Sequence, residues 1–272
     1  MTKLQMKLVA IVVLICLSPT ASAFAIQEPQ LSEEQMQNFL LTAKVIKSSS
    51  TKKGITGVRK LTLSDGQITH DASFQSIDEY SATKRFDSGR MEVNFRDSYK
   101  YNIAAYELAK LLGLRDMIPM TVERKWGDKV GSLCWWVPSK LDEEVRQKKK
   151  ITAPDPEGWA KQYNKMVVFG QLVFDVDRNQ GNILYTEEWH LWMIDFSRSF
   201  RNHIDLENPK ALTRCDRELF AALKQLDSAK LAEATKRYLT TLEIKGVMAR
   251  RDKIVALFEK LIAEKGEGRV LY

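Results

Sequence analysis

The acidic residues of the stretch FDVDRNQGNILYTEEWHLWMIDFSRSF, residues 174–200, stand beside short apolar runs that read as buried strands. Burying a lone carboxylate is costly, so such a group is normally hydrogen-bonded, paired with a cation or bound to a metal ion. Asp177 and Asn182 share one glycine-containing loop, and Asp195 follows the apolar run LWMI. A hairpin of this length can bring Asn182 and Asp195 to one metal ion. Because Mg²⁺ prefers oxygen ligands, the segment predicts a metal-assisted phosphoryl-transfer site.

The chain has few residues or motifs that would support other catalytic chemistries. The only histidines are His70, His190 and His203, which are widely separated, and the sequence contains no CxxC, HExxH or GxSxG motif. These absences disfavour a zinc site and a histidine-based triad. Cys134 and Cys215 can either form one disulfide or remain as buried thiols, and the sequence leaves both possibilities open.

The N-terminus has the pattern of a secretory signal peptide. Lys3 and Lys7 precede an apolar run over residues 8–17, and Ala21 and Ala23 occupy the small-residue positions of a cleavage site. We therefore expect residues 1–23 to be removed and the protein to be exported, to the periplasm or the medium. The alternative is an uncleaved anchor, although the run is too short to span a bilayer. No later segment is long enough to cross a membrane.

The composition is that of a globular protein that binds an anionic ligand. The chain has 272 residues, of which 44% are hydrophobic and 28% charged, and its formal net charge is +7. A mildly basic balance fits a nucleotide ligand. Because no sustained basic stripe with interleaved aromatic residues occurs, we expect no nucleic-acid partner.

Apolar periodicity and turn signals predict an α+β fold with two lobes. After a short helix over residues 32–43, three strands are expected between residues 44 and 76, with a turn at residues 64–66 and a polar, irregular stretch at 78–96. Asp97 is expected to cap a helix that ends before Gly113, and two strands flank a turn at residues 127–128. The remainder reads as helices at 157–173, 216–226, 228–239 and 242–264, with two short strands at 183–185 and 191–194. A hinge near residues 136–140 would separate a strand-rich lobe, 24–137, from a helical lobe, 138–272.

The order DRNQGNIL…WMIDFSRSF resembles the catalytic and metal-binding segments of the atypical protein-kinase-like superfamily. This superfamily includes phosphatidylinositol lipid kinases, HipA-type bacterial kinases and secretory-pathway casein kinases, and the chain is most similar to exported bacterial members without an assigned substrate. The resemblance extends over most of the chain after residue 23. It implies that Asp177 is the catalytic base, that Arg178 orients the catalytic loop, and that Asn182 and Asp195 bind Mg²⁺ or Mn²⁺.

The same resemblance locates a nucleotide site. The segment KKGITG, residues 52–57, contains Gly54, Thr56 and Gly57, whose backbone amides could surround phosphate groups. Such turns are also common outside phosphate sites. Trp135 and Trp136 would form the hinge next to adenine, and core packing is the alternative for these two side chains.

One lysine that the resemblance leads us to expect beside the phosphates is replaced by a neutral residue. Relatives carry a lysine in the third strand and a glutamate in the next helix, whereas Gln75 and Asn102 stand at these places here. An ion pair would thus become an amide pair. Lysines of the glycine loop and its flanking strand could partly substitute. Arg198 and Arg201 could bind phosphate or lie on a solvated face, and the sequence does not separate these alternatives.

The leading hypothesis is an exported kinase that uses metal-bound ATP to phosphorylate a protein or a small hydroxyl acceptor. The rival hypotheses are a pseudokinase that binds or regulates without transfer, and a nucleotidyl transferase on the same fold. An observation against the first hypothesis is that a periplasmic location is poor in ATP. The acceptor is not defined by the sequence.

Overall fold

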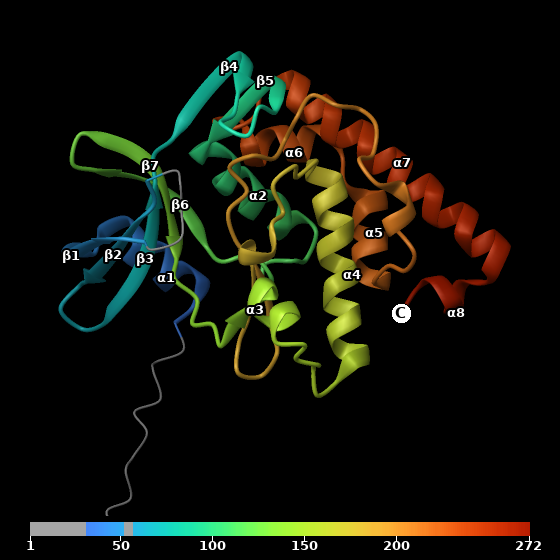
Figure 1. The fold of residues 1–272 in the computed structure, drawn as a ribbon, viewed down its shortest axis with the longest axis horizontal. Helices are drawn as coiled ribbons and strands as arrows, with labels where there is room; N and C mark the ends of the chain where they lie inside the picture. Colours follow the sequence, from blue (N-terminus) through green and yellow to red (C-terminus); the bar gives the residue numbers. More distant parts are fainter. Residues whose placement is uncertain (1–30, 52–56) are drawn as a thin grey trace, which may run out of the picture.

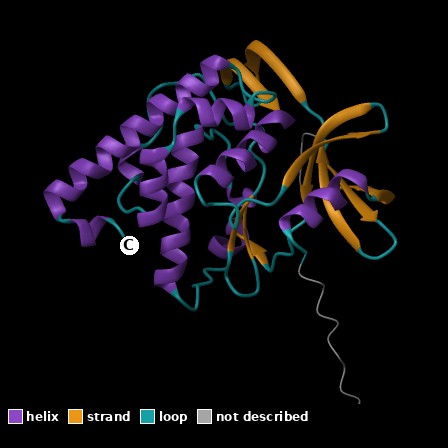
Figure 2. Ribbon diagram, turned by 180° about the vertical axis from the view of Figure 1, so that it is seen from behind, coloured by secondary structure: helices purple, strands orange, loops and turns teal. Residues whose placement is uncertain are grey.

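The structure is a computed structural model that describes residues 31–51 and 57–272. Strands dominate the N-terminal half and helices the C-terminal half (Figure 1; Figure 2). Gly54 and Thr56, predicted to bind phosphate, and the expected signal peptide, residues 1–23, lie outside the described residues. No helix within the described ranges is long and apolar enough to cross a bilayer.

A five-stranded antiparallel sheet forms the body of the N-terminal half. Its order is β1-β2-β3-β7-β6, with bounds Lys44–Ser50, Arg59–Ser64, Thr69–Gln75, Lys129–Trp135 and Thr121–Trp126 in that order. The β2–β3 turn forms as the sequence predicts, because Asp65 Oδ1 accepts hydrogen bonds from the amides of Gln67 and Ile68. Between β6 and β7, Gly127 adopts φ +64°, a left-handed conformation that favours glycine.

The two faces of this sheet have different neighbours. Phe74 and Leu133 are paired across β3 and β7, are buried, and belong to the core that includes helix α1, Glu33–Thr42. Because successive side chains of a strand point to opposite faces, Gln75 and Ser132 face the other way. That second face lies toward the loop that follows β10, as the hydrogen bonds described below show.

A β4–β5 hairpin stands where the sequence suggested irregular structure. Its strands, Asp78–Arg85 and Met91–Ser98, lie apart from the five-stranded sheet, at the top of the view in Figure 1. The prediction of irregular structure for residues 78–96 was wrong. Along β5, Met91, Val93 and Phe95 alternate with polar residues, but Met91 and Val93 are 60% and 70% exposed, so most of this face covers no core.

Helix α2, Tyr99–Leu111, follows the hairpin directly. The expected cap was Asp97, but the structure places Asp97 inside β5, and the hydroxyl of Ser98 accepts the hydrogen bond from the amide of Lys100. Gly113 has φ +70° after the helix end, as predicted. The helix buries its apolar face, including Ile103 and Leu108, against the sheet and α6.

The C-terminal half is built around two long helices, α4 and α7, which pack on each other. Its helices are α3 (Glu143–Lys148), α4 (Pro156–Val173), α5 (Arg217–Gln225), α6 (Ser228–Thr235), α7 (Thr241–Lys265) and α8 (Glu267–Val270), with short 3-10 turns at Gln180–Asn182 and Pro209–Ala211. Helix α4 begins with Asp155 accepting a hydrogen bond from the amide of Gly158 and with Pro156 in its first turn, both favourable helix starts. Helices α4, α5 and α7 match the predicted ones to within one residue at each end, α6 ends four residues earlier than predicted, and α3 and α8 were not predicted.

A small three-stranded sheet positions the loops of interest. It consists of β8 (Leu141–Asp142), β9 (Ile183–Tyr185) and β10 (Leu191–Met193) in the order β10-β9-β8. The β9–β10 pairing confirms the hairpin expected from the sequence. The sequence left open whether Cys134 and Cys215 form a disulfide or remain as thiols. In the structure both are free thiols.

Candidate active site

The loop that carries Asp177 begins where helix α4 ends. Phe174 leaves the helix with a left-handed backbone, φ +51°, and turns the chain into residues 175–182. Asp175 is buried, and its Oδ1 accepts a hydrogen bond of 3.2 Å from the amide of Asp177. Asp175 therefore orients the loop, while Asp177 is exposed as a residue although its carboxyl is partly desolvated by the protein around it.

Arg178 ties the two functional loops together. Its guanidinium donates to the carbonyls of Ile194 at 2.6 Å, Asn182 at 3.2 Å and Asp195 at 3.4 Å, and pairs with the Asp175 carboxylate. It also lies over the Phe196 ring, 4.2 Å from the centroid. All of these groups belong to the protein, and contacts of this kind are those expected of a residue that orients the loop.

Asn182 and Asp195 are brought together by the β9–β10 hairpin. The amide of Ile194 donates to the carbonyl of Asn182 at 3.0 Å. Asp195 is the next residue after Ile194, so the hairpin brings its backbone close to that of Asn182. Asp195 has φ +56°, a conformation uncommon for a residue with a side chain and found most often at functional sites. Asn182 Nδ2 also donates to the carbonyl of Asp177 at 3.4 Å.

The donor set fits a hard divalent cation that shares its ligands with a nucleotide. Within residues 31–51 and 57–272, no three His, Cys, Asp or Glu side chains form a complete metal cage. Mg²⁺ seldom uses such a cage and is usually bound by one or two protein oxygens together with phosphates and water. Asp195 and Asn182 carry side-chain oxygens of this kind, and their role as metal ligands stays a prediction.

The electrostatic field at Asp177 comes from its acidic neighbours. Burial raises the pKa of the Asp177 carboxyl above its ordinary value, and the carboxylates of Asp195, Asp175 and Asp97 raise the pKa further. The guanidinium of Arg198 acts in the opposite direction. The raised pKa suits a proton acceptor, because a base works best when its pKa approaches the working pH.

Asp97 is a site residue that the sequence did not reveal. It is only 4% exposed, and its Oδ1 has no hydrogen-bond partner among the described residues. The amide of Ser98 donates to the carbonyl of Ser197 at 2.9 Å, which ties this end of β5 to the loop after Asp195. Burial raises the pKa of Asp97, and the nearby Asp195 adds to this effect. From the sequence, Asp97 was interpreted as the cap of the following helix. Its place near Asp195 could therefore not be predicted.

Gln75 and Asn102 form the amide pair expected from the sequence register. Asn102 Nδ2 donates to Gln75 Oε1 at 2.6 Å and to Ser132 Oγ at 3.2 Å. Asn102 Oδ1 accepts a hydrogen bond of 2.6 Å from the amide of Phe196, the residue after Asp195. The pair therefore links β3 and α2 to the loop that carries the proposed metal ligand.

The two tryptophans at the end of β7 lie on opposite sides. The Trp135 ring stacks on His70 at 3.7 Å and meets Phe39 of α1 edge-on, on the face of the sheet away from Gln75. The Trp135 ring thus packs in the core, and a place for the end of this strand beside adenine stays a prediction. Trp136 lies beneath Lys60, whose Nζ is 4.4 Å from its ring centroid and 2.8 Å from Asp71 Oδ2.

The glycine loop is described only at its end. Gly57 has φ +72°, as a phosphate-binding turn would allow, and is followed by β2. A contribution of this loop to nucleotide binding stays a prediction.

Arg198 and Arg201 are not part of a solvated face. Their side chains are 11% and 7% exposed, and both bind the carboxylate of Glu92 from β5, at 2.6 and 2.5 Å. Of the two alternatives that the sequence left open, the structure excludes the solvated one.

Comparison with solved structures identifies the fold. No protein-family model matches the sequence, and no curated protein matches it in sequence. A structure of hydra Fam20 with sugar has a TM-score of 0.66 at 17% identity, covering 88% of this chain and 91% of that chain. The Golgi casein kinase with Mn/ADP bound has a TM-score of 0.64 at 12% identity, covering 89% and 79% of the two chains. The Helicobacter pylori proinflammatory kinase CtkA has a TM-score of 0.55 at 10% identity, covering 83% and 98%.

These structures are all atypical protein-kinase-like proteins, and the chain has their fold. The resemblance read from the DRNQGN and IDFS segments is thereby confirmed at the level of the fold, as is the α+β architecture with a strand-rich part and a helical part. At sequence identities of 10–17%, the similarity to these structures establishes the fold alone.

Proposed function

We propose that the protein is an exported kinase-like phosphotransferase that uses metal-bound ATP to phosphorylate a protein or a small hydroxyl compound. The observation that carries this proposal is the unit formed around Arg178. Its hydrogen bonds to the carbonyls of Asn182, Ile194 and Asp195 hold the Asp177 loop and the Asp195 loop as one rigid body. The fold shared with the Golgi casein kinase, whose structure holds Mn/ADP, supports the choice of cofactors.

Each side chain then has a defined task. Asn182 and Asp195 would hold Mg²⁺ or Mn²⁺, which when bound offsets the charge of the phosphate oxygens. Asp177 accepts the proton of the acceptor hydroxyl. The hydroxyl oxygen forms a bond to the γ-phosphorus as the bond from that phosphorus to the β-phosphate oxygen breaks, and ADP leaves.

A pseudokinase is the second candidate, and one observation favours it. Gln75 and Asn102 hydrogen-bond to each other as neutral amides, so this pair contributes no positive charge to the phosphates. A protein that binds nucleotide weakly and transfers nothing would show this feature. The metal loop and Asp177 are retained in full, which is why transfer is the leading proposal.

Intact-mass measurement of the purified protein with ATP and Mg²⁺ or Mn²⁺ tests the proposal. Phosphate addition to the protein or to an added acceptor, lost in Asp177→Asn, is the expected result. Addition of a nucleotide instead of a phosphate would identify a nucleotidyl transferase. Nucleotide binding without any mass change, with every metal and acceptor tried, would identify the pseudokinase.

Export is tested separately by the N-terminus of the mature protein. Protein recovered from the cell envelope or the medium should begin near Phe24. A cytosolic protein that retains Met1 or Thr2 would contradict export and leave the proposed chemistry untouched.

A further inference from the structure

Asp97 is a buried carboxylate to which the proposed chemistry gives no task. It belongs to β5 and is only 4% exposed. Its Oδ1 atom is shielded from solvent and has no hydrogen-bond partner among the described residues. Taking a carboxylate out of water is costly, so a buried one normally has a cation or a hydrogen-bond donor on each oxygen. The free oxygen of Asp97 therefore points to a partner outside the described side chains.

Strand β5 directs Asp97 toward the loop that follows β10. Because side chains alternate along a strand, Asp97 lies on the same face as Phe95. Phe95 is buried, and the guanidinium of Arg198 lies over its ring, 4.5 Å from the centroid. One residue beyond Asp97, the amide of Ser98 donates to the carbonyl of Ser197 at 2.9 Å. The buried face of β5 thus packs on the loop that carries residues 195–198.

The same loop carries the proposed metal ligand Asp195. The amide of Ser197 donates to Asp195 Oδ1 at 3.3 Å, and the side chain of Ser197 lies close enough to Asp97 to stabilise its charged form. The two carboxylates therefore flank one serine. Burial is the main reason why the pKa of Asp97 is raised, and the charge of the nearby Asp195 adds to this effect. A cation beside Asp195 would be felt by Asp97 as well.

Negative charge is in excess where these loops meet. Three carboxylates form no salt bridge within residues 31–51 and 57–272, namely Asp97, Asp177 and Asp195. The nearby cations already have acidic partners, since Arg178 pairs with Asp175 and Arg198 with Glu92. The charge of Arg198 also reaches Asp97 and Asp177, but one guanidinium cannot offset all of these carboxylates. Such an excess suits a divalent cation.

Asp97 does not complete a cage of direct ligands. No three His, Cys, Asp or Glu side chains of the described part of the chain could hold a metal ion together. Mg²⁺, however, usually keeps several of its water molecules when a protein binds it. Protein groups behind the direct ligands of a metal ion contribute to its affinity, and substituting them typically weakens binding by about 10–100-fold.

We propose that Asp97 holds the divalent cation through an intervening water molecule, behind the direct ligands Asn182 and Asp195. The inference rests on the metal site of the proposed function and adds one residue to it. The free oxygen of Asp97 accepts a hydrogen bond from that water, and the negative charge of Asp97 offsets part of the charge of the cation. This role accounts for a carboxylate that is buried, lacks a salt bridge and faces the Asp195 loop.

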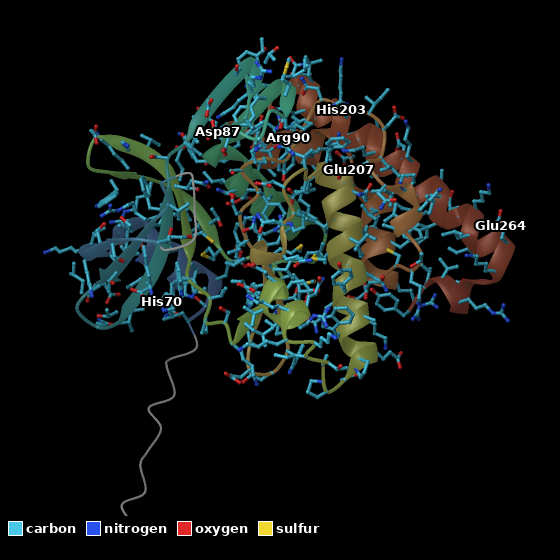
Figure 3. All side chains as sticks on the ribbon, in the orientation of Figure 1. His70, Asp87, Arg90, His203, Glu207 and Glu264 are labelled. Carbon is cyan, nitrogen blue, oxygen red and sulfur yellow. The ribbon has the colours of Figure 1, made fainter. Side chains whose placement is uncertain are left out.

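Titration with Mn²⁺ in the absence of nucleotide tests this role, with free Mn²⁺ followed by electron paramagnetic resonance. Asp97→Asn keeps the size of the side chain but removes its charge, and it should weaken Mn²⁺ binding by about tenfold. Asp195→Ala, which removes a direct ligand, should weaken binding further. Asp87→Asn is the matched control, because Asp87 is exposed in the turn of the same hairpin and its change removes the same unit of charge (Figure 3). It should bind Mn²⁺ as wild type does.

Urea unfolding with and without Mn²⁺ is a second measurement of the same affinity. With Mn²⁺ well above both dissociation constants, a tenfold loss of affinity lowers the metal-induced gain in the free energy of unfolding by about 1.4 kcal/mol. Each protein is compared with itself, so an effect of the substitution on the metal-free protein cancels. Asp97→Ser is measured in parallel, so that the result does not depend on the folding of one variant.

Equal Mn²⁺ affinity of wild type and Asp97→Asn would overturn the proposal and leave Asp97 a neutral, buried carboxyl group. An equal loss in Asp87→Asn would also overturn it, because the effect would then be one of net charge. Failure of the wild-type protein to bind Mn²⁺ at about 10 mM would overturn it together with the metal site itself.

Failure of the proposed phosphate transfer gives a different result. If the protein is not a phosphotransferase, Mn²⁺ binding and its weakening in Asp97→Asn persist while no phosphate is transferred from ATP, and the role of Asp97 stands. If only the role of Asp97 fails, phosphate transfer is observed and the Mn²⁺ affinities of wild type and Asp97→Asn are equal.

Discussion

The contact between Gln75 and Asn102 sets the charge available to a nucleotide. Two neutral amides bonded at 2.6 Å replace a cation and its anionic partner. A hydrogen bond to a charged group contributes about 1.5–3 kcal/mol against about 1 kcal/mol for a neutral pair. We therefore expect ATP to bind roughly tenfold more weakly than it would with a lysine at position 75, and to depend strongly on the divalent metal.

The double change Gln75→Lys with Asn102→Glu should tighten ATP binding by about tenfold, as measured by calorimetry with Mg²⁺. Glutamate at position 102 can still accept the hydrogen bond that Asn102 Oδ1 receives from the Phe196 amide. Each single change should improve binding less, because it leaves an uncompensated charge at position 75, which is buried, or at position 102, which is half-buried. Tight, metal-independent binding by the wild-type protein, or no gain in the double variant, would show that the pair does not contact the nucleotide.

Alanine variants of Asp195 and Asp177 should affect nucleotide binding and phosphate transfer differently. Asp195→Ala removes an oxygen ligand of the proposed metal and should abolish metal-dependent nucleotide binding in calorimetry. Asp177→Ala removes only the proton acceptor, so binding should persist while phosphate transfer is lost. A folded Asp195→Ala protein that binds Mg²⁺–ATP like wild type would exclude Asp195 from the metal site.

The pH dependence of transfer should report the carboxylate neighbours of Asp177. Burial and the charges of Asp195, Asp175 and Asp97 raise its pKa, so the base becomes deprotonated, and active, only at a higher pH than an ordinary aspartate. Asp97→Asn removes one negative charge and should shift the acid limb of the rate profile to lower pH. Arg198→Gln removes the opposing cation and should shift the limb to higher pH. Identical acid limbs in all three proteins would mean that another group controls this limb.

At the scale of elements, helix α7 fastens the two segments that carry the site. Arg250 is fully buried, and its guanidinium donates to the carbonyls of Leu172 at the end of α4, Arg201 at 3.0 Å and His203. Burial lowers the pKa of Arg250 to about 10, which leaves it charged at neutral pH. Gly246 permits this close packing, because a Cβ there would lie 3.0 Å from Arg250 Nη1. One side chain thus holds both the start of the Asp177 loop and the segment of residues 201–203.

Arg250→Met should lower the free energy of unfolding by roughly 3 kcal/mol, since it leaves several buried carbonyls without donors. Urea unfolding monitored by circular dichroism measures the change. Lys260→Met is the control on the same helix, because Lys260 is 77% exposed, and it should change stability by no more than about 0.5 kcal/mol. Equal stability of the two variants would show that these carbonyls find other donors without Arg250.

At the scale of the whole molecule, the two cysteines are separate free thiols, of which Cys215 is buried and Cys134 half-buried. Burial raises the pKa of Cys134 to about 11 and that of Cys215 to about 12, so neither thiolate forms appreciably at pH 8. The native protein should therefore react slowly with a thiol reagent, and the urea-unfolded protein quickly. Two reactive thiols after unfolding are expected if Cys16 is removed with residues 1–23. Three would show that the N-terminus is retained, and none would reveal a disulfide that the structure lacks.

Most helices and strands could be predicted from the sequence because their signals are local. The capping box at Ser32 and Gln35, the turn at Asp65 and the apolar face of α4 depend on residues within a few positions of one another. The order of Asp177, Asn182 and Asp195 likewise sufficed to predict the fold. These features are the part of the protein that the sequence by itself determined.

The ion pairs of Glu92, the place of Asp97 and the face of Trp135 were decided only by the tertiary structure. Glu92 meets Arg198 and Arg201 across sequence separations of 106 and 109 residues, and no local pattern records such a pairing. In the β4–β5 hairpin that carries Glu92, Met91, Val93 and Phe95 alternate with polar residues, but the adjoining β4 is largely polar, so the segment as a whole read as irregular. A local pattern can specify which segments become strands or helices, but which charges meet across the molecule depends on how those segments pack.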